Sequence, residues 1–156
     1  MLIKKMAMII LLLLISAALY PAVIENKGFA ANQDDMEEIR AVIKGAVEDD
    51  SWLYASDVTH IQKILSKYYQ GELLKNLVRD AWEFKSKNTD WYSSARLVSI
   101  TPKQLYDGGA MILAVIDVED CITGCRQTGS AVYDITDSGD EGWRIVNVVY
   151  RWNVEV

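Results

Sequence analysis

The stretch Tyr92–Trp152 decides the fold and reads YSSARLVSITPKQLYDGGAMILAVIDVEDCITGCRQTGSAVYDITDSGDEGWRIVNVVYRW. It contains four segments rich in Val, Ile, Tyr and Trp with turn residues between them, which is the pattern of strands joined by short loops. The strands are predicted over Tyr92–Tyr106, Ala110–Asp120, Cys125–Asp137 and Trp143–Asn153. Short loops favour antiparallel neighbours, so the stretch predicts an antiparallel meander.

The turn residues predict how these strands pair. Asp107-Gly108 signals a two-residue hairpin turn, because glycine adopts a positive φ without steric cost. That turn places Val98 opposite Asp117 and Ile100 opposite Val115. A three-residue loop over residues 122–124 places Asp117 opposite Gly129.

The last hairpin has two registers that differ by one residue. A loop over residues 139–142 turns Val148 and Tyr150 inward, whereas a slip by one residue turns Trp143 and Ile145 inward instead, and both stay open. With the first register, one face of the sheet is apolar and needs a cover. It is predicted to comprise Ile100, Met111, Leu113, Val115, Tyr133, Val148, Tyr150 and Trp152.

Three helices are predicted before the sheet. Asp35 with Glu38 resembles a capping box, and apolar residues then recur at helical spacing through Glu48. Asp57 is expected to cap a second helix, and a third covers about Glu72–Lys87. Helices followed by strands predict an α+β domain with its helices packed on one face of a bent antiparallel sheet of about four strands.

This order of elements resembles the NTF2-like (cystatin-like) superfamily. The resemblance is carried by the helix Glu72–Lys87, the meander Tyr92–Asn153 and the string Glu141-Gly142-Trp143-Arg144-Ile145, which is similar to a turn-and-strand motif near the end of these domains. It implies a cone with a pocket between helices and sheet. It also implies homodimers that form through the outer face of the sheet.

The N-terminus has the pattern of a secretory signal. Lys4-Lys5 is followed by the uncharged run Met6–Ile24 and by small residues at Gly28-Phe29-Ala30. We expect cleavage after Ala30, which makes residues 1–30 a signal peptide and residues 31–156 a secreted or extracytoplasmic domain. Residues 6–24 are also nearly long enough for an uncleaved membrane anchor, and that alternative stays open.

The charge of the chain excludes some partners. The 156 residues carry a formal net charge of −6, so the protein lacks the excess of Lys and Arg that binding to phosphates requires. We expect no nucleic-acid partner, and contact with a membrane only through an uncleaved N-terminal segment. An acidic chain of this kind indicates solubility more than an acidic recognition function.

Cys121 and Cys125 flank the second predicted loop. The trial register puts them directly across the hairpin, and export would place them in an oxidising compartment, so we expect a structural disulfide. A redox-active cysteine pair is the alternative to a structural disulfide, but the two cysteines do not have the C-x-x-C spacing. Two cysteines and the single His60 do not make a usual zinc set, so no metal is expected.

Asp117 is the carboxylate that the trial register places on the inward face. A desolvated Asp has a raised pKa and can act as a general base, as an inward Asp does in ketosteroid isomerases of the resembled superfamily. The alternative is a rim carboxylate paired in water with Arg96 or Arg126. His60 is expected to be a solvated helix residue.

Aromatic residues could line a ligand pocket or simply fill the core. The pocket candidates are Trp52, Tyr69, Trp82, Asp117 and Trp152. We expect an exported, non-catalytic domain without a cofactor that binds a small apolar ligand or an envelope protein. The alternatives are a small isomerase, dehydratase or hydrolase that uses Asp117, and a membrane-anchored accessory domain of an envelope assembly.

Overall fold

The computed structural model describes residues 33–87 and 92–152. Its helical part consists of α2 (Gln33–Glu48), the short 3-10 helix η1 (Ser51–Tyr54), α3 (Val58–Leu65) and α4 (Gly71–Ser86). The strands are β1 (Ser93–Tyr106), β2 (Gly109–Asp120), β3 (Arg126–Asp137) and β4 (Trp143–Trp152), with a 3-10 turn η2 (Gly139–Glu141) before β4. The expected signal segment, residues 1–30, lies outside the described residues.

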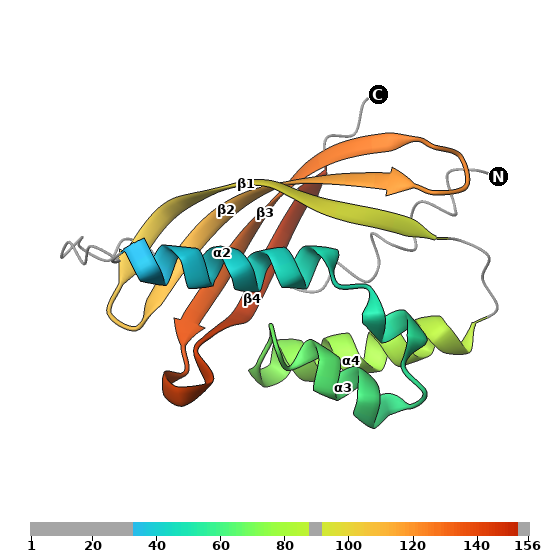
Figure 1. Ribbon diagram of the computed structural model, residues 1–156, viewed down its shortest axis with the longest axis horizontal. Helices are drawn as coiled ribbons and strands as arrows, with labels where there is room; N and C mark the ends of the chain where they lie inside the picture. Colours follow the sequence, from blue (N-terminus) through green and yellow to red (C-terminus); the bar gives the residue numbers. More distant parts are fainter. Residues whose placement is uncertain (1–32, 88–91, 153–156) are drawn as a thin grey trace.

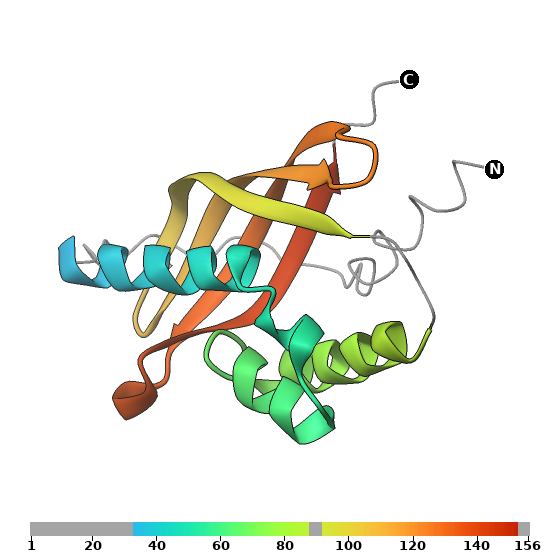
Figure 2. The same ribbon diagram turned by 45° about the vertical axis from the view of Figure 1, so that its right-hand side comes forward.

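The four strands form one curved antiparallel sheet in the order β1-β2-β3-β4. Helix α2 lies across one face of this sheet, and α3 and α4 lie side by side next to the β4 end of the same face (Figures 1 and 2). The predicted α+β class, with helices before a sheet of four strands, is confirmed. In the part of the chain that is described, no helix is long and apolar enough to cross a membrane.

The core lies between the helices α2, α3 and α4 and the covered face of the sheet. Ile39 and Ile43 of α2 and Ile61 of α3 are fully buried, as the helical spacing of these residues predicts. Asp57 caps α3 as expected, because its carboxylate accepts a hydrogen bond from the His60 amide at 2.8 Å. The sheet contributes a further set of fully or almost fully buried residues: Ala110, Ile112, Ala114, Ile116, Ala131, Tyr133, Ile135 and Ile145.

The predicted register of β1 and β2 is right only next to the turn. Tyr106 pairs with Gly109 across Asp107-Gly108, but the register shifts between Pro102 and Gln104 and again between Leu97 and Ser99. These two irregularities place Arg96, not Val98, opposite Asp117. A bulge adds a residue to one strand only, and the turn alone does not reveal it.

The predicted register of β2 and β3 is wrong by one residue. The Asp120 amide donates to the Cys125 carbonyl at 2.9 Å, so the loop has four residues, 121–124, rather than three. Ile116, not Asp117, therefore faces Gly129, and the inward set of β2 is Ala110, Ile112, Ala114 and Ile116 instead of Met111, Leu113 and Val115. Both sets are apolar, so the sequence pattern did not choose between them.

Both candidate registers of the last hairpin occur, one in each half of β4. Ile135 pairs with Ile145, whereas Asp134 pairs with Asn147, so the register shifts by one residue at Val146. Before the shift Trp143 and Ile145 are buried in the core. After it, Val148 and Tyr150 lie on the covered face, because Val148 pairs with Tyr133 and Tyr150 with Ala131.

Candidate ligand cavity

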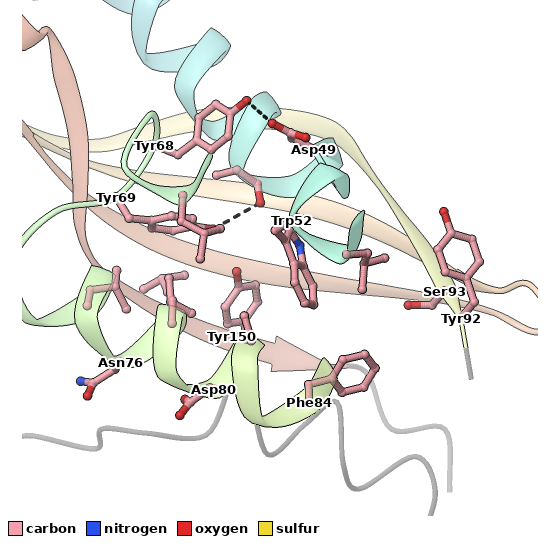
Figure 3. A pocket seen from close by; sticks show the side chains of 17 residues that line it. Asp49, Trp52, Tyr68, Tyr69, Asn76, Asp80, Phe84, Tyr92, Ser93 and Tyr150 are labelled. Carbon is pink, nitrogen blue, oxygen red and sulfur yellow. Dashed lines mark hydrogen bonds between the residues drawn. The ribbon is translucent and has the colours of Figure 1, made fainter. Parts of the chain in front are cut away.

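A cavity of about 280 Å³ lies between α4, the end of α2, η1 and the second half of β4 (Figure 3). Most of its wall is aliphatic or aromatic, and the exceptions are Asp49, Asn76, Asp80 and Ser93. The apolar wall and the tyrosines comprise Ala46, Trp52, Leu53, Leu65, Tyr68, Tyr69, Leu73, Leu77, Ala81, Phe84, Tyr92, Val148 and Tyr150. A mostly apolar concavity with few polar groups is typical of a site for a small molecule.

Helix α4 forms one long wall of the cavity. Leu73, Leu77, Ala81 and Phe84 recur at helical spacing and all line it. Opposite them, Trp52 of η1 meets the Phe84 ring edge-on, with 6.1 Å between ring centroids. The apolar stripe of α4 therefore covers a cavity as well as a packed core.

A lysine of α4 fastens η1 to this wall. Lys85 Nζ donates to the Ala55 carbonyl at 2.8 Å and also to the carbonyl of Leu53. These bonds satisfy carbonyl groups at the end of η1, where the backbone has no helical partner. The position of Trp52, one residue before Leu53, is thereby tied to α4.

Asp49 and Tyr68 form one end of the cavity. The Tyr68 hydroxyl donates to Asp49 Oδ2 at 2.8 Å, the Ser51 amide donates to Oδ1 at 3.0 Å, and Lys67 Nζ lies 3.9 Å from Oδ2. Burial opposes ionisation of Asp49, but these interactions outweigh it and lower the pKa of the carboxyl. Burial and the bond to Asp49 raise the pKa of Tyr68 to about 12. At neutral pH an ionised carboxylate therefore lies beside a neutral phenol.

Two further tyrosines place hydroxyl groups at the centre of the cavity wall. Tyr69 donates to the Ala46 carbonyl at 3.2 Å, and the Tyr150 hydroxyl lies 3.5 Å from that of Tyr133. Burial raises the pKa of all three phenols, Tyr69, Tyr133 and Tyr150. They are neutral hydrogen-bonding groups at physiological pH.

The structure brings together two of the predicted pocket residues, Trp52 and Tyr69. Trp82 does not line the cavity and is 39% exposed on α4. Trp152 does not line the cavity either, and it stacks on Tyr150 with 6.1 Å between centroids and 2° between planes. Its indole Nε1 is buried with no hydrogen-bond partner among the described residues.

Sequence reasoning missed Asp49 and Tyr150 as lining residues. Asp49 belongs to the acidic run at the end of α2, and such a run indicates the end of a helix rather than a ligand site. Tyr150 was predicted to face inward, yet nothing local marks it as a cavity residue rather than a core residue. Both become wall residues through tertiary packing of α4 at a distance from β4 that leaves space between them.

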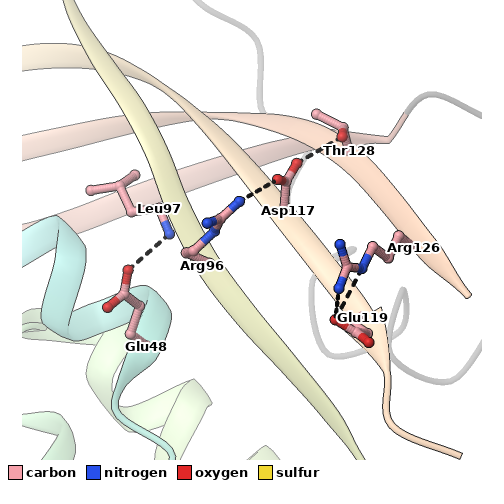
Figure 4. Close-up of polar contacts among 7 residues, drawn as sticks. All are labelled: Glu48, Arg96, Leu97, Asp117, Glu119, Arg126 and Thr128. Atoms are coloured by element: carbon pink, nitrogen blue, oxygen red, sulfur yellow. Dashed lines mark hydrogen bonds and ion pairs between the residues drawn. The ribbon is translucent and has the colours of Figure 1, made fainter. Parts of the chain in front are cut away.

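The prediction that Asp117 faces inward is wrong. The four-residue loop and the shift in β1 turn it to the outer face, where it accepts from Thr128 Oγ1 at 2.7 Å and from Arg96 Nη2 at 3.2 Å (Figure 4). The bond from Thr128 and then that from Arg96 lower the pKa of Asp117. This carboxylate is about one-third exposed and is ionised, so it lacks the raised pKa of a buried general base. Asp117 therefore matches the alternative reading, a carboxylate that is paired with Arg96.

The hairpin loop between β2 and β3 carries both cysteines as free, exposed thiols. The expected bridge is not formed in this structure, and Cys125 lies opposite Asp120 rather than Cys121 because of the four-residue loop.

At the start of this hairpin Arg126 pairs with Glu119 at 3.0 Å (Figure 4). Within residues 33–87 and 92–152 no group of His, Cys, Asp and Glu side chains is arranged to hold a metal ion.

Comparison with known proteins identifies the fold. No family model matches the chain, and no curated protein matches it in sequence. The chain is similar in fold to several solved structures, and three of them superpose on about four-fifths of it. The first is a proposed aromatic ring hydroxylase from Novosphingobium aromaticivorans. The superposition covers 79% of this chain and 92% of the hydroxylase chain, with a TM-score of 0.55 and 9% sequence identity.

The second similar structure is nuclear transport factor 2 from Cryptosporidium parvum. The superposition covers 81% of this chain and 100% of that protein's chain, with a TM-score of 0.53 and 16% sequence identity. The third is a domain of unknown function with a cystatin-like fold from Nostoc punctiforme, with coverage of 81% and 82%, a TM-score of 0.54 and 16% identity. At these identities the similarity is one of fold. The expected NTF2-like, cystatin-like architecture is confirmed.

Proposed function

We propose that this NTF2-like domain is a binding protein that holds a small, mainly apolar ligand in the cavity between α4, η1 and β4. The observation that carries the proposal is the cavity itself: about 280 Å³ of space walled by aliphatic and aromatic side chains. A packed interior leaves few voids larger than a water molecule, so a cavity of this size within a small domain favours a ligand site.

The electrostatics of the wall favour binding over catalysis. Asp49 lines the cavity, and the interactions around it lower the pKa of its carboxyl. A general base that works near neutral pH needs a raised pKa, and Asp49 is also occupied by donors from Tyr68 and Ser51. Its role here is to hold Tyr68 in place at the cavity end.

The experiment uses N-phenyl-1-naphthylamine, a neutral probe that becomes fluorescent in apolar surroundings. The variant Leu77→Trp adds bulk inside the cavity, whereas Glu83→Trp adds the same side chain at an exposed position of the same helix. We expect the wild type and Glu83→Trp to bind the probe, and Leu77→Trp to lose binding while its unfolding midpoint stays close to that of Glu83→Trp. Equal binding by both variants would overturn the proposal.

A protein partner is the second candidate, favoured by two large hydrophobic side chains that are exposed. Tyr54 of η1 is 77% exposed and Ile122 in the hairpin loop is 60% exposed. The loop adjoins the cavity wall, because the Cys121 amide donates at 3.0 Å to the carbonyl of Tyr92, which lines the cavity. Photo-crosslinking from position 54 or 122 in the host would yield one specific protein adduct, and position 103, exposed at the other end of β1, would yield none.

The proposed place of action is outside the cytoplasm. This rests on the basic start Lys4-Lys5, the apolar run Met6–Ile24 and the small residues before Ala31. An uncleaved N-terminal segment would make the protein a membrane-anchored accessory domain of an envelope assembly. Salt washing of membranes separates the two cases, since an anchored protein stays with the membrane and a processed one does not.

A further inference from the structure

Four tyrosines line the cavity, and three of them donate their hydroxyl proton to the protein. Tyr68 donates to Asp49 at 2.8 Å and Tyr69 to the Ala46 carbonyl at 3.2 Å. Tyr92 donates to Asp50 Oδ2 at 2.5 Å. The fourth, Tyr150, has only another hydroxyl as its partner among the described residues, that of Tyr133.

The burial of Tyr133 decides the direction of this last bond. Tyr133 is 0% exposed and does not line the cavity, so its proton can reach no acceptor among the described residues except the Tyr150 oxygen. If Tyr150 donated instead, the Tyr133 proton would be buried without a partner, which is the costlier arrangement. Tyr133 therefore donates, and the Tyr150 proton is left for the cavity.

We infer that Tyr150 is the hydrogen-bond donor to the ligand, and that the ligand is an apolar molecule with a neutral oxygen acceptor, such as a carbonyl or ether oxygen. The hydroxyl of Tyr150 points into the space between Tyr69 and Trp52 in Figure 3. Because Tyr133 donates to the Tyr150 oxygen, it does not compete with the ligand for the Tyr150 proton. This inference rests on the proposed ligand-binding function.

The acceptor is neutral because the cavity is acidic. Asp49 and Asp80 line it, and no Lys or Arg does so among the described residues. Lys67 and Arg79, which pair with these two aspartates, are more than half exposed. A carboxylate ligand would bring a like charge beside Asp49 in a partly desolvated space, which weakens its binding.

The test compares two probes of nearly the same shape, 2-acetylnaphthalene with a ketone oxygen and 2-ethylnaphthalene without one. Their dissociation constants are measured for the purified protein and for Tyr150→Phe and Tyr133→Phe. We expect Tyr150→Phe to bind the ketone about fivefold to tenfold more weakly, the loss of one neutral hydrogen bond, and to bind the hydrocarbon as the wild type does. Tyr133→Phe keeps the preference for the ketone.

Two results would overturn the inference while leaving ligand binding intact. One is equal weakening of both probes by Tyr150→Phe, which would mean that the ring only packs. The other is a ketone preference that appears only in Tyr133→Phe, which would mean that Tyr150 donates to Tyr133 in the wild type. If the wild type binds neither probe, the proposed function fails and this inference fails with it.

The carbonyl stretching frequency of bound 2-acetylnaphthalene gives an independent readout. A hydrogen bond lowers this frequency, so we expect a lower value in the wild type than in Tyr150→Phe. Packing alone would not move it between the two proteins. An unchanged frequency would contradict the assigned donor even if the affinities differ.

Discussion

The Tyr68 hydroxyl donates to the Asp49 carboxylate at 2.8 Å, which connects the loop before α4 to the residue that follows α2. Tyr68→Phe should lower the free energy of unfolding by about 1–2 kcal/mol, the loss of a hydrogen bond to a charged group at a half-buried position. The pKa of Tyr68 is raised to about 12, so this stabilisation is complete below about pH 10 and disappears as the pH rises through about 12. Urea titrations of both proteins from neutral to alkaline pH measure it, with Tyr54→Phe as the exposed control.

Asp49→Asn should destabilise the domain at neutral pH and have little effect in acid. The folded protein holds the pKa of Asp49 below its ordinary value of 3.8, so the carboxylate contributes stability above that value and loses it as the pH falls through the folded pKa. The difference in unfolding free energy between wild type and variant should therefore shrink below about pH 4. A difference that stays constant down to acid unfolding would show that Asp49 is not ionised in the fold.

Gly45→Ala should destabilise the protein although it lies inside helix α2. In an exposed helix this change stabilises by about 0.5–1 kcal/mol. Here a Cβ at position 45 would lie 2.1 Å from the Tyr68 ring, which is held by its bond to Asp49. We expect a net loss of about 1–3 kcal/mol by thermal or urea unfolding. In the Tyr68→Ala background the same substitution should become neutral or stabilising.

The intact mass of the protein from its native host tests processing and the cysteines together. If the chain is exported and cleaved, the mass matches residues 31–156, and a further loss of two hydrogens reports a bridge between Cys121 and Cys125. The structure shows both as exposed free thiols, so thiol labelling before and after reduction is the matched control. A full-length mass would contradict cleavage, and complete labelling without reductant would contradict the bridge.

The outer face of the sheet remains our proposed site for a homodimer. On β2 this face carries Met111, Leu113 and Val115, which alternate with the buried inward set. Val115→Arg should convert a dimer into a monomer in light scattering after size exclusion, because a charge within an apolar interface is costly. Val58→Arg, at an exposed valine in α3, should leave the dimer intact. A monomeric wild type would rule out this dimer.

The sequence predicted the element order because each element has a strong local signal. Asp57 caps its helix and Asp107-Gly108 makes its turn as expected, since both depend on neighbouring residues only. The face of β2 was not predictable, because Ile112 and Leu113 are equally apolar and a loop of three or four residues decides between them. Of the predicted pocket residues, Trp52 and Tyr69 line the cavity, whereas Asp49 became a wall residue only through the placement of η1 and α4.

The one-residue shift at Val146 gives β4 two independent halves. Residues 143–145 close the core, and residues 148–152 contribute the wall of the cavity and its support. Side chains alternate along a regular strand, so without the extra residue the choice of inward residues in one half would also fix the inward residues of the other half. The insertion allows the cavity-facing side chains Val148 and Tyr150 to be changed while Ile145 of the core remains the same. A deletion of Val146 should do the opposite, exchanging the interior and exterior residues of half a strand in a single step.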